Sequence, residues 1–183
     1  MNDGTAALVA HIPSLRRYAR ALTGDAWMAD DLVQDTLERA CDKWRLWTAG
    51  TDLRAWLFTL MHNLFANQAR RAPLHRTPMD IDELAEHLPA PDAPPERRID
   101  LQRCLLQLPD EQRAVLLLVA LEDLSYDDAA RILGVPAGTV MSRLSRARSR
   151  LRELMEGGAA ADAASTAATA PAAPVRTPLR RLK

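Results

Sequence analysis

Three stretches of the first seventy residues place an apolar residue at every third or fourth position. They are residues 8–22, 33–47 and 53–71. This spacing puts the apolar side chains on one face of an α-helix, where a neighbouring helix can bury them. Thr23-Gly24 ends the first stretch and Ala49-Gly50-Thr51 ends the second, because glycine favours turns. The pattern therefore predicts three amphipathic helices.

A proline-rich, acidic segment follows the third stretch. Six of the twelve prolines lie between Pro73 and Pro95, and residues 76–97 hold six acidic residues against two arginines. This composition is typical of a linker, with one short helical turn expected at residues 81–87. The chain is thereby divided into a helical domain at residues 5–73, a linker at 74–96, a second helical domain at 97–156 and a tail at 157–183.

The second predicted domain ends in a helix-turn-helix pattern. Its four expected helices cover residues 99–108, 109–121, 126–133 and 137–155. Ser125 can cap the third of them, and Gly134-Val135-Pro136 turns the chain into the fourth. A short helix, a glycine turn and a longer helix form the motif whose second helix enters the major groove of DNA.

The last of these helices has a basic face. Arg143, Arg146 and Arg150 recur at steps of three and four, and Arg148 and Arg152 extend the basic surface. A guanidinium group matches both phosphate oxygens and guanine edges. The alternatives are an arginine-rich face in solvent or a helix that binds another protein. We favour DNA contact because the preceding short helix and turn complete the motif.

The third predicted helix has an outer face that suits unstacked bases. Trp56, Asn63, Asn67 and Arg70 lie on it at helical spacing. Aromatic planes stack on bases, and amide and guanidinium groups form hydrogen bonds with them. The alternative interpretation is a tryptophan in the core and asparagines in solvent.

The second predicted helix has an acidic face instead. The face carries Asp30, Asp31, Gln34, Asp35, Glu38 and Arg39. No intramolecular cation is visible in the pattern to neutralise its carboxylates. Because negative charge repels DNA, this face is either solvated or a docking surface for a protein with basic residues.

Composition narrows the fold and the function. Of 183 residues, 60 are alanine or leucine and only 11 are valine or isoleucine, a ratio that favours an all-α fold. Equal numbers of basic and acidic residues, 24 of each, exclude a uniformly basic nucleic-acid coat. Cys41 and Cys104 are far apart, and the four histidines lack partners at metal-ligand spacing. We therefore expect no enzyme activity, no metal, no cofactor and no small-molecule substrate.

Two further expectations concern location and the tail. The longest apolar run has eight residues, and no basic segment before an apolar one opens the chain, so we expect a cytoplasmic protein. The tail at 157–183 has ten alanines and no periodic apolar face, and is predicted to be disordered.

Four blocks of the chain resemble the extracytoplasmic-function (ECF) group of bacterial RNA polymerase sigma factors. The blocks are DDLVQDTLERA (30–40), LRAWLFTLMHN (53–63), LPDEQRAVLLL (108–118) and LSYDDAARILGVPAGTVMSRLSRARSRLRE (124–153). Their order and spacing agree with that family, and the resemblance covers residues 8–156. It implies an alternative sigma factor that directs core polymerase to specific promoters and is held inactive by an anti-sigma factor.

The resemblance also implies a role for each surface. Core polymerase, through its β′ clamp, would be bound by Asp30, Asp31, Gln34, Asp35 and Arg39; the β flap is a further expected contact. The −10 promoter element would be bound by Thr48, Ala49, Gly50, Thr51, Asp52, Leu53, Trp56, Asn63, Asn67 and Arg70. The −35 element would be bound by Thr139, Met141, Ser142, Arg143, Arg146 and Arg150.

Two positions depart from the family pattern. Met141 stands where a basic residue is common, and offers an apolar contact to a thymine methyl instead. Leu53 stands where an aromatic residue is common, which weakens stacking on a captured base. Two alternatives to a sigma factor stay open: a sigma-like module that binds another regulator, and a helix-turn-helix regulator that acts without core polymerase.

Overall fold

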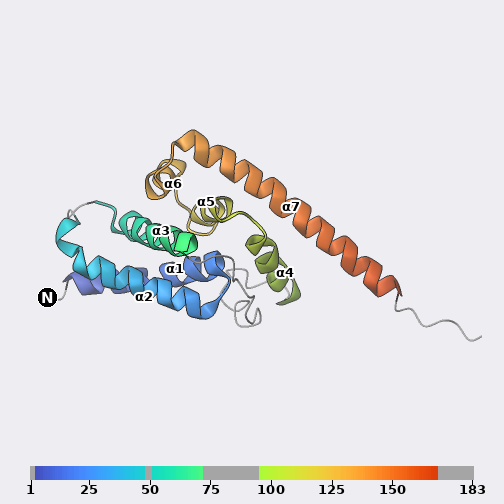
Figure 1. Cartoon of the computed structure of the whole chain (residues 1–183), viewed down its shortest axis with the longest axis horizontal. Helices are drawn as coiled ribbons and strands as arrows, with labels where there is room; N and C mark the ends of the chain where they lie inside the picture. The colour runs from blue at the N-terminus through green and yellow to red at the C-terminus, as the bar shows by residue number, and fades with distance from the viewer. Residues whose placement is uncertain (1–2, 48–50, 72–94, 169–183) are drawn as a thin grey trace, which may run out of the picture.

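The computed structural model is helical throughout the residues it describes, which are 3–47, 51–71 and 95–168 (Figure 1). Its elements are α1 (Asp3–Thr23), α2 (Ala26–Asp42), the 3-10 helix η1 (Trp44–Leu46), α3 (Leu53–Arg71), α4 (Pro95–Leu106), α5 (Asp110–Ala120), α6 (Tyr126–Leu133) and α7 (Ala137–Ala168). The predicted all-α fold with two helical domains, the second ending in a helix-turn-helix, is confirmed. The predicted helical turn at 81–87 lies outside the described residues.

Helices α1, α2 and α3 form the first domain, and polar caps define where two of them begin. The Asp25 carboxylate accepts a hydrogen bond from the Met28 N–H at 2.8 Å at the start of α2. Asp52 does the same for the Ala55 N–H at 3.1 Å at the start of α3. These bonds satisfy amides that have no partner within the helix. The predicted span of α3, residues 53–71, is confirmed.

The second helix is shorter than its apolar pattern predicts. It ends at Asp42, and the chain continues as the 3-10 helix η1. The indole rings of Trp44 and Trp47 pack together there, with centroids 5.0 Å apart. Residues three apart eclipse each other in a 3-10 helix, so this tighter turn brings the two rings into contact.

Helices α4 to α7 form the second domain, whose helix-turn-helix is built as predicted. The Ser125 side chain accepts from the Asp128 N–H at 3.1 Å and caps α6. Gly134 has φ +64°, a left-handed conformation that ends α6 at low steric cost. Arg113 is buried beneath these helices and donates to the Asp110 carboxylate at 2.6 Å.

The last helix is longer than predicted. The sequence predicts an end near Met155 and a disordered tail from Gly157, whereas α7 continues through Ala168. Residues 157–168 hold seven of the tail's ten alanines, and alanine has the highest helix propensity. Residues 169–183 lie outside the described part of the chain.

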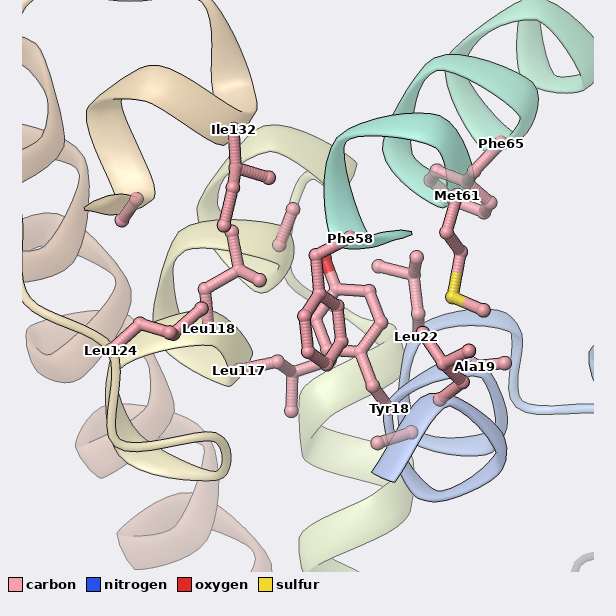
Figure 2. Packing of buried hydrophobic residues seen from close by; sticks show 14 of the residues in the cluster. Tyr18, Ala19, Leu22, Phe58, Met61, Phe65, Leu117, Leu118, Leu124 and Ile132 are labelled. Atoms are coloured by element: carbon pink, nitrogen blue, oxygen red, sulfur yellow. The ribbon is translucent and has the colours of Figure 1, made fainter. Parts of the chain in front are cut away.

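The two domains share one hydrophobic core, which the sequence does not predict. Figure 2 shows Tyr18 and Phe58 between Leu117 of α5 and Leu22 of α1. The rings of Tyr18 and Phe58 meet edge to face, with centroids 5.2 Å apart. Helix α1 packs against α4 and α5, and α3 packs against α6 (Figure 1). The first domain therefore rests directly on the second.

Candidate functional site

The acidic face of α2 borders a groove shared with α1. The apolar side chains of Ile12, Val33 and Leu37 line this groove, and charged residues surround them. The groove is completed by Arg16, Asp30, Gln34, Glu38, Cys41 and Asp42. Asp31 and Arg39 are exposed on the same helix. An apolar strip with a charged rim can receive an amphipathic segment of a protein partner.

One carboxylate of this face is neutralised within the chain, contrary to the expectation from the sequence. Asp30 lies 3.1 Å from Arg16 Nε and 3.6 Å from Arg20 Nη2, both on α1. The expected absence of an intramolecular cation is therefore wrong for Asp30. The two arginines are provided by the packing of α1 against α2.

Asp35 is the least exposed carboxylate of the face. Burial raises the pKa of its carboxyl group above the usual value, and the negative charges of Asp31 and Glu38 raise this pKa further, while Arg39 opposes them. The Gln68 amide of α3 donates to Asp35 Oδ2 at 3.5 Å. The carboxylates of Asp31, Asp35 and Glu38 therefore lie close enough to repel one another, and they make one surface of α2 negative.

The polar face of α3 is only partly as predicted. Asn63, Asn67 and Arg70 are exposed on it. Trp56 is half-buried and packs against the core. Before the helix, Thr51 and Asp52 are exposed and Leu53 is half-buried, whereas residues 48–50 lie outside the described residues.

Helix α7 exposes three of its six predicted DNA-reading residues to solvent. Met141, Arg146 and Arg150 are exposed, and Thr139 and Ser142 are half-buried. Arg146 donates from Nη2 to Ser142 Oγ at 3.3 Å, and Ser142 donates to the Thr139 carbonyl at 3.0 Å. The exposed arginines border a groove lined by Gln107, Pro109, Gln112, Ser145, Arg146, Ser149, Arg150 and Glu153.

Arg143 differs from the other arginines of α7. Its Nη2 atom lies 2.5 Å from Glu111 Oε2 of α5, and its side chain is 22% exposed. It also lies close to His62 of α3. Burial lowers the pKa of His62 below its usual value, and the positive charge of Arg143 lowers this pKa further, while Glu111 opposes both effects. One residue of the predicted recognition face therefore lies at the junction of the two domains.

A second cluster of charges crosses the same junction. Glu122, in the loop between α5 and α6, has a fully buried side chain. Its Oε1 atom accepts from Arg17 Nε at 3.0 Å and from Arg17 Nη2 at 2.9 Å. Its Oε2 atom accepts from Arg54 Nη2 at 2.7 Å. The sequence analysis missed these residues because their partners lie 105 and 68 positions away in the chain.

Comparison with known proteins assigns the family. Residues 8–62 match the family described as "Sigma2 domain of PhyR", and residues 98–151 match "Sigma-70, region 4". The ECF RNA polymerase sigma factor EcfG of Rhodopseudomonas palustris (strain TIE-1) is 40% identical over 152 residues, covering 81% of this chain and 82% of that protein. The chain belongs to the ECF sigma factor family. This family is non-enzymatic.

Solved structures agree with this assignment. The sigma factor is similar to RpoE of Bartonella quintana, solved in complex with the anti-sigma factor NepR, with a TM-score of 0.72 and 33% identity. The match covers 85% of this chain and 98% of that one. CnrH, solved with the cytosolic domain of CnrY, gives a TM-score of 0.63 and 26% identity, covering 84% and 87%. Among the described residues, no helix of the sigma factor is long and apolar enough to cross a membrane.

Proposed function

We propose that this ECF sigma factor divides promoter recognition among three helices. The acidic face of α2 binds core RNA polymerase, the exposed face of α3 captures bases of the −10 element, and α7 reads the −35 element. The observation that carries this proposal is the separation of charge: carboxylates gather on α2, whereas exposed arginines gather on α7. A helix rich in carboxylates favours a basic protein partner, and a helix rich in guanidinium groups favours DNA.

The groove between α1 and α2 supports a second partner for the first domain. Ile12, Val33 and Leu37 give it an apolar lining beside the acidic face. The similar sigma factor RpoE was solved in complex with the anti-sigma factor NepR, and CnrH was solved in complex with the cytosolic domain of CnrY. We infer that an anti-sigma factor occupies this groove and competes with core polymerase for α2.

A sigma-like module without promoter activity is the second candidate. The match of residues 8–62 to the family described as "Sigma2 domain of PhyR" favours it. The exposed Arg146, Arg148 and Arg150 favour promoter binding, because a protein-binding module does not require such a row. Promoter-dependent run-off transcription with core polymerase distinguishes the two, since only a sigma factor yields a product.

Charge reversal on α2 tests the docking role. We expect Asp31→Arg combined with Asp35→Arg to weaken binding to core polymerase at least about tenfold, because like charges across an interface cost several kcal/mol. Binding is measured by titration of labelled core. The control is Glu153→Arg combined with Glu156→Arg, which makes the same charge change on exposed residues of α7. Equal affinity of the α2 variant and the unaltered protein would refute docking by this face.

Alanine substitutions along α7 test the −35 role. We expect Arg146→Ala to lose about 1–3 kcal/mol of preference for a specific over a scrambled duplex, because Arg146 lies one turn nearer than Arg150 to the start of the helix, where side chains reach base edges. Arg150→Ala is the matched control, and should weaken binding to both duplexes alike and reduce the salt slope by about one. Titrations at several salt concentrations measure both quantities. If Arg146→Ala lost the same affinity for both duplexes, Arg146 would contribute only electrostatic binding, which would contradict base recognition by this residue.

A further inference from the structure

The last nine residues of the sequence, 175–183, form a basic segment with regularly placed apolar residues. This tail segment reads VRTPLRRLK, in which the valine and both leucines are each followed directly by a basic residue. It holds four basic residues and no acidic one, a net charge of +4. A segment of this composition suits an apolar strip with an acidic border.

The groove between α1 and α2 has the complementary composition. Its apolar strip consists of Ile12, Val33 and Leu37, three side chains against the three of the tail segment. Residues 30–42 of α2 hold five carboxylates and one arginine, a net charge of −4. Opposite charge on two surfaces steers them together and fixes the register in which they bind.

The carboxylates beside the groove lie where a cationic segment would stabilise them. Burial raises the pKa of the Asp35 carboxyl group, and the charges of Asp31 and Glu38 raise this pKa further. Guanidinium groups placed along this face offset that repulsion. The groove therefore favours a basic occupant over a neutral one.

Two prolines lower the entropy that the tail segment loses on docking. Pro174 precedes it and Pro178 lies within it. A proline ring fixes its own φ and restricts the residue before it. A segment with fewer conformations when free loses less entropy when it is bound.

The course of α7 favours the groove of a second copy over that of the same chain. Leu154 packs against the hydrophobic core, and α7 continues for 14 residues beyond it to Ala168, or about 21 Å of helix. Figure 1 shows this end of α7 beyond α4, pointing away from α1 and α2. Val175 follows Ala168 by seven positions, at most about 25 Å of extended chain. This length starts on the side of the molecule away from its own groove.

We propose that residues 175–183 of one copy dock in the groove between α1 and α2 of a second copy, so that the sigma factor associates with itself. The apolar residues of the tail segment contact Ile12, Val33 and Leu37, and its basic residues pair with the carboxylates of α2. The consequence for transcription rests on the proposed role of α2 in binding core polymerase. A molecule whose groove is filled is withheld from core, and the filled fraction rises with the concentration of the protein.

Disulfide trapping between two full-length copies tests the docking, because the exposed Cys41 lines the groove. One copy keeps Cys41, and the other, which carries a size tag, has Cys41→Ser and Thr177→Cys; both have Cys104→Ala. We expect a mixed dimer after treatment with oxidised glutathione, in lower yield at high salt. In the matched control the first copy has Cys41→Ser and Trp27→Cys, which moves the exposed thiol to the start of α2, outside the groove.

Two outcomes of the trapping experiment would overturn the proposal. A yield of mixed dimer no higher than in the Trp27→Cys control would show that the tail segment does not dock in the groove. A single chain with both Cys41 and Thr177→Cys that forms only an intrachain disulfide would show that the groove receives its own tail and not that of a second copy.

Exchange of charges between the two surfaces tests their pairing. We expect Arg180→Glu combined with Arg181→Glu on the tail-bearing copy to lower the yield of mixed dimer several-fold. Glu38→Arg combined with Asp42→Arg on the other copy should restore it, because the charges are then opposite again. A yield that the second pair does not restore would refute docking on the acidic face. An unchanged yield together with weaker binding to a DNA duplex would assign the tail segment to DNA instead.

A last comparison separates the docking of the tail segment from the role of α2. We expect Leu179→Asp combined with Leu182→Asp to abolish self-association in sedimentation velocity and to raise the apparent affinity for core polymerase several-fold. The matched control is Ala172→Asp combined with Ala173→Asp, which adds the same charge just before the tail segment. Unchanged self-association in the leucine variant would overturn the proposal. Lost self-association with unchanged affinity for core would refute the proposed role of α2 and leave the docking in place.

Discussion

His62 lies where α3 meets the second domain, and its surroundings favour the neutral imidazole. Burial is the main cause of its lowered pKa, and the nearby Arg143 guanidinium adds to it. Its Nδ1 atom is buried without a hydrogen-bond partner among the described residues. A group of this kind makes the free energy of unfolding depend on pH.

We expect the free energy of unfolding to fall as the pH is lowered below about 6.5, the usual pKa of histidine. In this range the unfolded chain gains a proton at His62 while the folded chain resists it, so the unfolded state is stabilised. The free energy of unfolding falls by at most about 1.4 kcal/mol per pH unit, and it stops falling once the pH is below the pKa of His62 in the folded protein. Urea unfolding at pH 7.5 and 5.5 measures it.

The control variants for this prediction are His62→Gln and His11→Gln. In His62→Gln the free energy of unfolding should depend less on pH than in the unaltered protein. In His11→Gln, which removes an imidazole from α1, the dependence on pH should be unchanged. The same slope in His62→Gln as in the unaltered protein would show that another group is responsible.

At the scale of elements, the turn between α6 and α7 depends on backbone conformation. Gly134 has φ +64°, and an added Cβ at this position would meet no atom within 4 Å. Any cost of a side chain here is therefore conformational strain rather than a clash. The nearby Gly138 also has open space around it, but it lies within α7 and its φ is not positive.

These two glycines should respond to alanine with opposite signs. We expect Gly134→Ala to destabilise the protein by about 1–2 kcal/mol, because an L side chain is strained in the left-handed region. Gly138→Ala should stabilise it by up to about 1 kcal/mol, because alanine is the better helix former. Denaturant unfolding of the two variants provides the comparison. A loss of stability in Gly138→Ala equal to that in Gly134→Ala would contradict the assigned conformations.

At the scale of the whole molecule, the turn between α1 and α2 touches the end of α4. A Cβ built on Gly24 would lie 2.5 Å from both terminal carbons of Leu106, and Gly24 has φ +75°. The glycine therefore permits both the turn and the close approach of the second domain. Its role in domain contact can be separated from its role in the turn.

A double-mutant cycle with Leu106 separates the role of Gly24 in the turn from its role in the domain contact. We expect Gly24→Ala to destabilise the protein by about 2–4 kcal/mol, from left-handed strain and from overpacking against Leu106. In a Leu106→Ala background the clash disappears and only the strain is left, so the added cost should fall by about 1–2 kcal/mol. Thermal or urea unfolding of the four proteins gives the coupling. Additive effects would show that the two residues are not in contact.

Local features of this protein were determined by the sequence itself. The span of α3, the Ser125 cap, the turn at Gly134 and the helix-turn-helix follow from residues a few positions apart. Helical periodicity and capping are local, so they are visible without a fold. The ends of α2 and α7 were less visible, because the packing of Trp44 on Trp47 and an alanine-rich continuation decide them.

Tertiary structure alone decided which charged residues meet. Glu122 pairs with Arg17 and Arg54 across the domain junction, Asp30 pairs with Arg16 and Arg20, and Arg143 turns toward Glu111. Nothing in the pattern of any single helix selects such partners, because electrostatic contacts depend on distance in space and not along the chain. The sequence identified the helix of the helix-turn-helix that carries the arginines, and the packing of α5 against α7 determined that Arg143 is less exposed than the others.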